Sequence, residues 1–174
     1  MKKLIIINGT MGVGKSTVCN ILLNTLKPSV YLDGDWCWKM NPFIISEENK
    51  KMVIDNITYL LKSYLDNSGY EYVIFCWVIH QEDIFKQILE PLNDCEFELH
   101  KISLICSEAA LKSRLNLDVK NGIRKDDIID KSVERLHLYN NMSTVKIDVS
   151  DSAPKQIAIK IVKLIEKGAK DERV

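Results

Sequence analysis

One segment governs the architecture of this chain, and it reads Gly9-Thr10-Met11-Gly12-Val13-Gly14-Lys15-Ser16. It matches the pattern G-x-x-x-x-G-K-[ST], whose glycines let the backbone wrap around a polyphosphate with the N–H groups pointing inward. The lysine of the pattern reaches the β- and γ-phosphates, and the hydroxyl group that follows it coordinates Mg²⁺. The sequence therefore predicts a loop that binds the phosphates of a nucleoside triphosphate together with Mg²⁺.

The residues around this loop fit a strand before it and a helix after it. The segment Leu4-Ile5-Ile6-Ile7 is the continuous apolar run of a buried strand. After the loop, apolar residues recur at the spacing of one helix face: Val18, Ile21, Leu22 and Leu26. A chance glycine-rich turn requires neither flank, so this order of elements favours a true phosphate loop. The residues predicted to contact the nucleotide here are Gly9, Met11, Gly12, Val13, Gly14, Lys15, Ser16 and Thr17.

The composition excludes several classes of protein. With 174 residues, of which 46% are hydrophobic and 28% are charged, the chain fits one globular domain. Lysine plus arginine and aspartate plus glutamate each number 24, so the net charge is zero. We therefore expect no nucleic-acid partner and no attraction to an anionic membrane, because both require a basic excess.

The cysteines indicate a reducing environment. They are dispersed along the chain as Cys19, Cys37, Cys76, Cys95 and Cys106. No C-x-x-C pair is present, which argues against a structural metal site and favours reduced thiols in the cytoplasm. The chain starts directly with the first predicted strand, and no apolar run approaches the roughly 18 residues of a membrane span. We expect a cytoplasmic protein that is a monomer or a homodimer.

Strand and helix patterns alternate along the whole chain. Further strands are predicted near residues 30–32, 72–79, 102–106 and 145–149, with helices between them. This alternation after a phosphate loop predicts the α/β fold of P-loop NTPases, a three-layer doubly wound sandwich with a five-stranded parallel sheet. We expect the ligand at the carboxyl ends of the strands. Within a single domain, 1–174, we expect an acceptor-binding helical region at about 36–70, a short lid at about 116–126, and a helix over about 127–141.

A second group of motifs follows near the predicted lid. It reads L-x-x-R-L at residues 111–115, R-x-D-D at 124–127 and R-L-x-x-Y at 135–139. These motifs resemble the lid and the following helix of adenylate kinase and its relatives, the small nucleoside-monophosphate kinase-like enzymes. The resemblance implies that Arg124 and Arg135 contact the transferring phosphoryl group, and that Arg114 lies against the adenine or helps to close the lid.

Physical chemistry supports these roles for the arginines. Phosphoryl transfer depends on positioning and on neutralising charge at the γ-phosphoryl oxygens, and one well-placed arginine contributes roughly 10³–10⁵ in rate. The alternative is that the arginines are solvated helix residues paired with Asp126, Asp127 or Glu134. Arginine is scarce in this sequence, and three of its arginines hold the motif positions, which favours the functional interpretation.

The acceptor side differs from adenylate kinase. That family grips the phosphate of its acceptor with arginines located between the first helix and the third strand, whereas here no arginine precedes Arg114. Lys39 offers a cation but not the bidentate fork of arginine. The end of the third strand, Trp77-Val78-Ile79-His80-Gln81, also lacks the aspartate of a Walker B motif. We therefore expect an acceptor that is not a nucleotide.

A pair of aspartates follows the second predicted strand, in Leu32-Asp33-Gly34-Asp35-Trp36-Cys37-Trp38. This D-x-D is similar to that of gluconate kinase and shikimate kinase, which phosphorylate hydroxyl groups of small metabolites. By that analogy Asp33 contacts the Mg²⁺ shell or accepts the hydroxyl proton, and Asp35 hydrogen-bonds the acceptor alcohol. The alternative is an ordinary Asp-Gly turn whose carboxylates cap a helix.

The other candidates for acceptor contacts are Trp36, Trp38, Lys39, Phe43 and His80. Indole rings beside a cleft form apolar walls with an N–H donor, and a core position for both tryptophans is equally open. A lone histidine is more often a satisfied surface residue than a ligand, so His80 has that alternative as well.

Together these patterns predict an ATP-dependent phosphotransferase that moves the γ-phosphoryl group of MgATP to a hydroxyl of a small non-nucleotide metabolite or drug-like compound. The predicted catalytic residues are Lys15, Asp33, Arg124 and Arg135, and the predicted metal contacts are Ser16 and Asp33. Two alternatives stay open: a nucleoside or nucleotide kinase, and a nucleotide-dependent switch or binding protein without a small-molecule acceptor.

Overall fold

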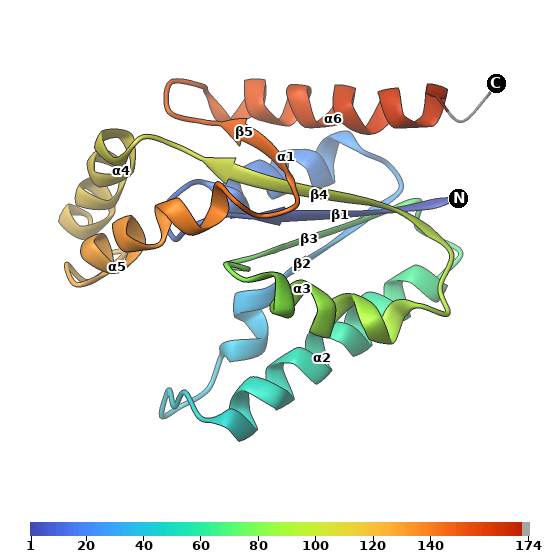
Figure 1. Cartoon of the computed structure of the whole chain (residues 1–174), viewed down its shortest axis with the longest axis horizontal. Coiled ribbons are helices and arrows are strands. Elements are labelled where there is room, and N and C mark those ends of the chain that lie inside the picture. The colour runs from blue at the N-terminus through green and yellow to red at the C-terminus, as the bar shows by residue number, and fades with distance from the viewer. Residues whose placement is uncertain (172–174) are drawn as a thin grey trace.

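Strands and helices alternate along the backbone, as the sequence predicts (Figure 1). The computed structural model describes residues 1–171. The strands are β1 (Lys2–Asn8), β2 (Ser29–Asp33), β3 (Tyr72–Trp77), β4 (Phe97–Ile105) and β5 (Val145–Asp148). The α-helices are α1 (Lys15–Thr25), α2 (Glu47–Asp66), α3 (Glu82–Leu89), α4 (Glu108–Lys120), α5 (Ile128–Glu134) and α6 (Pro154–Asp171). The short 3₁₀ helices are η1 (Gly34–Trp38), η2 (Glu90–Leu92) and η3 (Leu136–Tyr139).

The strands within residues 1–171 form one five-stranded sheet in the order β2-β3-β1-β4-β5. Every neighbouring pair is parallel, and β1 lies between β3 and β4. Along the chain, β2 and β3 come first and lie on one side of β1, and β4 and β5 follow on its other side. A crevice therefore opens beyond the carboxyl end of β1, where such sheets bind ligands. The predicted fold class is confirmed.

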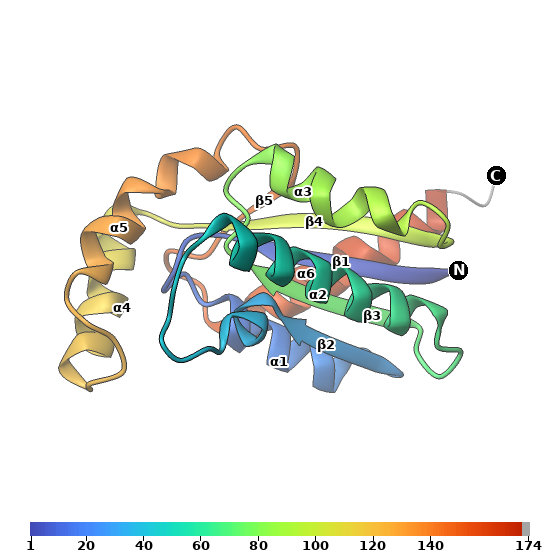
Figure 2. The same ribbon diagram turned by 90° about the horizontal axis from the view of Figure 1, so that it is seen from below.

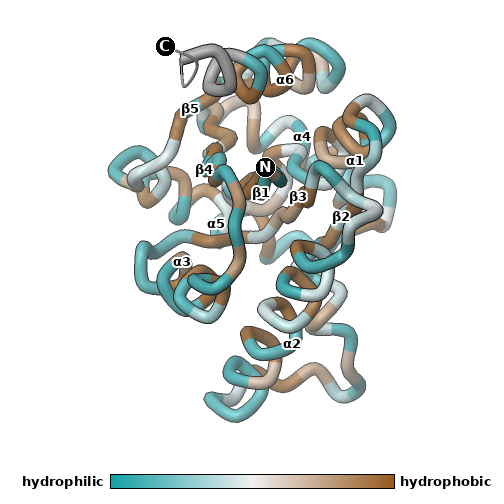
Figure 3. The backbone as a smooth tube through the Cα atoms, turned by 90° about the vertical axis from the view of Figure 1, so that its right-hand side faces the viewer, coloured by the Kyte–Doolittle hydropathy of each residue, from teal (hydrophilic) through white to brown (hydrophobic). Residues whose placement is uncertain are grey.

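Helices cover both faces of this sheet, so its central strand is apolar on both sides. In β1, Ile5 and Ile7 pack toward α1 and α6, whereas Leu4 and Ile6 pack toward α2 and α3, and all four are fully buried. Figure 3 looks along the strands and shows the helices arranged around them on both sides. Within residues 1–171, no helix is long and apolar enough to cross a membrane.

Local sequence signals set the beginnings of two helices. Ser46 precedes α2, and its side chain accepts a hydrogen bond from the backbone N–H of Asn49. Ser107 caps α4 in the same way, accepting from the N–H of Ala110. Both caps satisfy backbone donors that the first helical turn leaves free.

The end of α4 lies later than the sequence indicates. Residues 116–120 are expected to belong to the lid loop, yet α4 continues to Lys120. A surface helix tolerates polar side chains, and the stop is made instead by Gly122, which has a φ of 70° and whose N–H bonds to the carbonyl of Val119 at 2.9 Å. The irregular connection between α4 and α5 is therefore 121–127. Similarly, the helix expected over 127–141 is divided into α5 and η3.

The packing of α2 against the sheet yields a first prediction. Leu61 is fully buried in the cluster that joins α2 to the sheet, so Leu61→Ala leaves a cavity and lowers the free energy of unfolding by about 2–5 kcal/mol. Urea denaturation followed by circular dichroism measures this loss. Tyr59 lies on the same helix with 74% of its surface exposed, and Tyr59→Ala should stay within about 0.5 kcal/mol of the parent. Equal losses in the two variants would contradict this orientation of α2.

Candidate functional site

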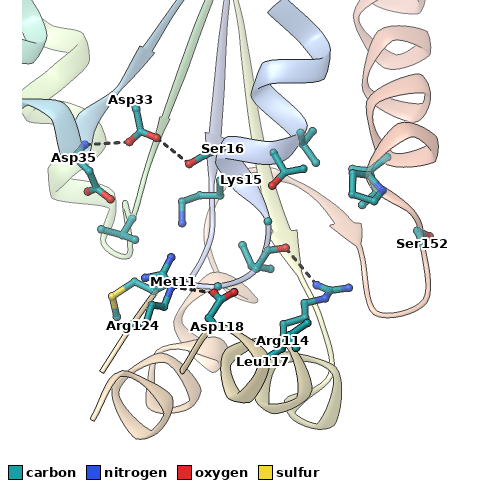
Figure 4. A pocket seen from close by; sticks show the side chains of 18 residues that line it. Met11, Lys15, Ser16, Asp33, Asp35, Arg114, Leu117, Asp118, Arg124 and Ser152 are labelled. Carbon is teal, nitrogen blue, oxygen red and sulfur yellow. Dashed lines mark hydrogen bonds and ion pairs between the residues drawn. The ribbon is translucent and has the colours of Figure 1, made fainter. Parts of the chain in front are cut away.

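A cavity of about 380 Å³ opens at the carboxyl ends of the strands, where β1 continues into the phosphate loop (Figure 4). Its walls come from segments that are far apart in the sequence: the loop and α1, the end of β2, the residue after β3, α4, the connection 121–127, and the start of α6. The lining residues are Met11, Gly12, Val13, Gly14, Lys15, Ser16, Thr17, Val18, Asp33, Asp35, Val78, Arg114, Leu117, Asp118, Arg124, Ser152, Pro154 and Ile157. All residues predicted to contact the nucleotide line it except Gly9.

Two glycines give the phosphate loop its shape. Gly12 and Gly14 have φ angles of 79° and 105°, in the left-handed region where other residues are strained. A Cβ atom at Gly12 would also lie 2.4 Å from the side chain of Leu115 on α4. Gly14 directly precedes α1, so free N–H groups and the positive end of the helix dipole border the cavity. This local geometry is suited to binding an anion.

Lys15 bends back over the loop that precedes it. Its Nζ donates hydrogen bonds to the carbonyl oxygens of Gly9 at 2.9 Å and Thr10 at 3.0 Å. Burial lowers the pKa of the Lys15 ammonium, and nearby acidic groups, Asp33 and Asp35 among them, offset part of that effect. The carbonyl dipoles of Gly9 and Thr10 stabilise the positive charge of this ammonium only in part. A phosphate group beside it would stabilise that charge more strongly, because it carries a full negative charge.

Asp33 is the centre of a hydrogen-bond network at the end of β2. Its Oδ2 accepts from Ser16 Oγ at 2.8 Å and from the hydroxyl of Tyr31 at 2.9 Å, and its Oδ1 accepts from the backbone N–H of Asp35 at 3.1 Å. These donors compensate the burial of the carboxylate, which is 8% exposed. Asp33 also caps η1. The alternative of a helix-capping carboxylate is therefore observed, and the same carboxylate is hydrogen-bonded to Ser16.

Gly34 allows the two aspartates to sit close together. A Cβ atom at this position would lie 2.5 Å from the ring of Trp77 at the end of β3, so the close approach of η1 to β3 requires glycine. Asp35 follows on the exposed side of η1 and lines the cavity. Partial burial of its carboxyl raises the pKa of Asp35, and the charge of Asp33 raises it further. A carboxylate with a raised pKa at a cavity wall is suited to accepting a proton.

The structure brings two of the three predicted arginines to the cavity. Arg114 lines it and is held by the backbone, donating to the carbonyl of Val13 at 3.3 Å and to that of Ser150 at 3.2 Å. Arg124 also lines it, and its Nε donates to Asp118 Oδ2 at 3.1 Å. Arg135 is half-buried between α5 and η3 and is not among the lining residues. Its role at the phosphoryl group stays a prediction.

The aromatic residues predicted to contact the acceptor lie beside this cavity rather than in its lining. Trp36 is 54% exposed, which rules out a fully buried core position, and its ring packs edge-on against Tyr31 with the centroids 5.3 Å apart. Trp38 is half-buried and packs against the hydrophobic cluster that α2 and α3 form with the sheet. Its ring contacts Phe43 with the centroids 5.8 Å apart.

The two polar residues predicted to contact the acceptor, Lys39 and His80, are also absent from the lining of the cavity. Lys39 is exposed at the end of η1. His80 is half-buried, and its Nδ1 lies 3.1 Å from the carbonyl oxygen of Val78. That contact fits the alternative of a satisfied histidine near the surface. Both residues therefore remain predictions as substrate contacts.

Several residues of the site were not predicted from the sequence. Tyr31 does not line the cavity but bonds to Asp33, and it was recognisable in principle, because it lies two residues before Asp33 and side chains at i and i+2 of a strand share a face. Asp118 lies in the polar stretch that resembles a loop. Ser152, Pro154 and Ile157, at the start of α6, carry no motif, and only the order of the strands brings them to the cavity.

The fold and the phosphate loop together define a P-loop NTPase. A family model described as an AAA domain matches residues 5–137, and the chain belongs to that family. The matched region contains the phosphate loop, the two aspartates and the three motif arginines. A comparison with curated proteins finds no match.

Solved structures share this fold over nearly their whole length. A gluconokinase from Sinorhizobium meliloti 1021 is 16% identical, with 99% of this chain and 98% of that chain covered and a TM-score of 0.70. The Deinococcus radiodurans tunicamycin resistance protein is 19% identical, with 95% and 96% covered and a TM-score of 0.68. A shikimate kinase from Acinetobacter baumannii, in complex with shikimate, is 20% identical, with 97% and 95% covered and a TM-score of 0.65.

The position of Lys15 yields a second prediction. Lys15→Met removes the cation over the loop and should weaken ATP binding by roughly 10- to 100-fold, the usual effect of losing a charge-assisted hydrogen bond. Isothermal titration calorimetry with MgATP measures the change. Lys39→Met serves as the control because Lys39 does not line the cavity, and it should bind as the parent does. Unchanged affinity in Lys15→Met would place the triphosphate elsewhere.

Proposed function

We propose that this protein is an ATP-dependent kinase that transfers the γ-phosphoryl group of MgATP to a hydroxyl of a small non-nucleotide metabolite or drug-like compound. One observation carries the proposal: Asp33 and Asp35 share a single cavity with Lys15 and Ser16 of the phosphate loop. The triphosphate and the acceptor hydroxyl would meet between these two pairs. The gluconokinase and shikimate kinase among the structural neighbours support a small hydroxylated acceptor.

Mg²⁺ fits the donor atoms at Ser16 and Asp33. A hydroxyl and a carboxylate are the oxygen ligands that this hard cation prefers, and Mg²⁺ usually takes few protein ligands besides phosphates and water. Within the described residues, no cluster of three or more His, Cys, Asp or Glu side chains forms a complete cage. Mg²⁺ bound with ATP neutralises charge on the phosphates. The hydrogen bond between Ser16 and Asp33 already holds the two side chains together.

The remaining roles follow from geometry. Asp33 is occupied by three donors, which favours the metal shell over proton abstraction for this residue. Asp35 has a raised pKa and a carboxyl at the cavity wall, which favours accepting the hydroxyl proton of the acceptor. Lys15 and Arg124 supply positive charge to the phosphoryl group, and Arg114 stabilises the nucleotide side of the cavity. Arg135 would have to turn inward to contribute.

A nucleotide acceptor is less well supported. The cations that line the cavity are Lys15, Arg114 and Arg124, and each has a role on the phosphate-donor side. The alternative nucleoside or nucleotide kinase relies on Lys39, Trp36 and His80, and the two polar residues of this set, Lys39 and His80, are not among the lining residues. The end of β3 lacks a carboxylate and has Cys76 and Trp77 instead, which is the feature that favours a nucleotide-dependent switch. Such a switch would bind ATP without transferring phosphate.

A transfer assay separates these possibilities. Incubation of the protein with γ-labelled ATP, Mg²⁺ and pooled cell metabolites should label a new small molecule, and Lys15→Ala should abolish the labelling. Asp35→Asn should retain MgATP affinity while transfer falls by about 10²-fold or more, the typical contribution of a general base. ATP binding without transfer to any metabolite, sugar or nucleoside would favour the switch.

The pH dependence of the reaction provides a further prediction. A general base works only when deprotonated, so kcat/KM for the acceptor should fall as the pH drops through the pKa of Asp35. Because that pKa is raised above the usual 3.8, the fall should begin at higher pH than for an ordinary aspartate. Steady-state rates between pH 4 and pH 9 measure the profile. In Asp35→Asn this acidic limb should disappear, and its persistence would assign the titration to another group.

A further inference from the structure

Four exposed apolar side chains follow Asp35 along the chain and have no role in the mechanism described so far. We call them the apolar rim: Trp36, Phe43, Ile44 and Ile45, which are 54%, 62%, 50% and 65% exposed. Loops normally expose polar residues, whereas a cluster of exposed apolar side chains on a soluble domain is typical of a binding site. Figure 3 shows the segment that leads into α2 in brown, the colour of hydrophobic residues.

The apolar rim begins one residue after the cavity wall. Trp36 directly follows Asp35, which lines the cavity. The loop with the other three rim residues connects η1 to α2, on the side of the strand ends opposite α4 and α5 (Figures 1 and 2). Two exposed apolar residues lie on that opposite side: Leu117, a lining residue that is 58% exposed, and Ile123, which is 67% exposed. Of these exposed apolar residues, Leu117 adds apolar surface to the cavity wall itself.

Trp36 and Phe43 each pack one ring contact against the domain, on Tyr31 and Trp38, whereas no packing contact within residues 1–171 requires Ile44 and Ile45 to be apolar. The buried face of α2 is formed by other residues, among them Val53, Ile57 and Leu61, and its cap is the hydroxyl of Ser46. The loop is anchored through its backbone, since Asn49 Nδ2 donates to the carbonyl of Ile44 at 2.9 Å. Polar side chains in place of Ile44 and Ile45 would leave all of these contacts intact.

The charges near the rim favour a neutral ligand. The segment 33–46 contains two aspartates and only one cation, Lys39. The cations of the cavity lie on its phosphate side, as described above. A carboxylate or phosphate on the acceptor would meet Asp35 without a compensating arginine. An uncharged alcohol avoids this repulsion, and an apolar group attached to it would gain contact with the rim.

We infer that the acceptor is an amphiphilic alcohol, whose hydroxyl lies at Asp35 and whose uncharged apolar chain or ring lies along Trp36, Phe43, Ile44 and Ile45. This inference rests on the proposed kinase function, and it adds the chemical class of the acceptor. It assigns the rim to substrate binding, rather than to a second copy of the chain or to a membrane surface.

Binding measurements test this assignment without requiring turnover. The probes are alkyl glucosides with chains of one, four and eight carbons, below their micelle concentrations, titrated into protein saturated with Mg²⁺ and a non-hydrolysable ATP analogue. Intrinsic tryptophan fluorescence reports Kd. Affinity should rise by about two- to fourfold per methylene group. The upper value corresponds to complete burial of each CH₂ group.

Matched substitutions locate the contact. Ile45→Ser and the double variant Phe43→Ser/Ile45→Ser should flatten the dependence of Kd on chain length. Ile159→Ser changes an isoleucine that is 54% exposed on α6, on the other face of the sheet, and should leave the dependence unchanged. ATP affinity should be the same in all variants, which separates loss of the rim from loss of the kinase site.

Three results would overturn the inference. The first is a Kd that does not depend on chain length, or a dependence that survives in the double variant. The second is a dimer in analytical ultracentrifugation that the double variant dissociates, because a second copy would then occupy the rim. The third is co-sedimentation with neutral phosphatidylcholine vesicles that the double variant abolishes. Failure of the transfer assay together with a chain-length effect would instead count against the kinase and retain the apolar site.

Discussion

The hydrogen bond from Ser16 Oγ to Asp33 Oδ2, at 2.8 Å, joins the first turn of α1 to the carboxyl end of β2. The phosphate loop connects β1 to α1, and β3 separates β1 from β2 in the sheet. The buried carboxylate requires donors, and Tyr31 and the N–H of Asp35 complete the set. Because the same carboxylate caps η1, this one bond fixes the spacing between the phosphate loop and the segment that carries Asp35.

The two sides of the cavity are built by different means. On the phosphate side, backbone N–H groups and glycines define the geometry, so few side chains are needed to preserve it. This is consistent with neighbours that keep the fold, with TM-scores of 0.65 to 0.70, at 16% to 20% identity. On the side that we propose for the acceptor, Asp35 lines the cavity, and exposed side chains of η1 and the loop before α2 follow it along the chain. Recognition of a particular acceptor therefore depends on residues that the fold leaves free to vary.

The sequence predicted what is encoded locally. The strand–loop–helix order around Lys15 follows from patterns within a few residues of each other, and the parallel sheet follows from the alternation of strands and helices along the chain. The end of α4 was missed, because the stop depends on the conformation of Gly122 rather than on polarity. The contribution of Ser152 to the cavity was not predicted, because only strand order brings the start of α6 there. Arg124 lines the cavity as its motif indicates, whereas Arg135 does not.

The ion pair between Arg124 and Asp118 has a consequence for how the cavity responds to its ligand. Arg124 lies on the connection 121–127, and Asp118 belongs to α4, so the pair ties the connection to the helix. A triphosphate carries several negative charges and competes with this single carboxylate for the guanidinium. Nucleotide binding would therefore exchange a contact within the protein for a contact with the ligand. Asp118, near the end of α4, would then lose its ion-pair partner whenever the cavity is occupied.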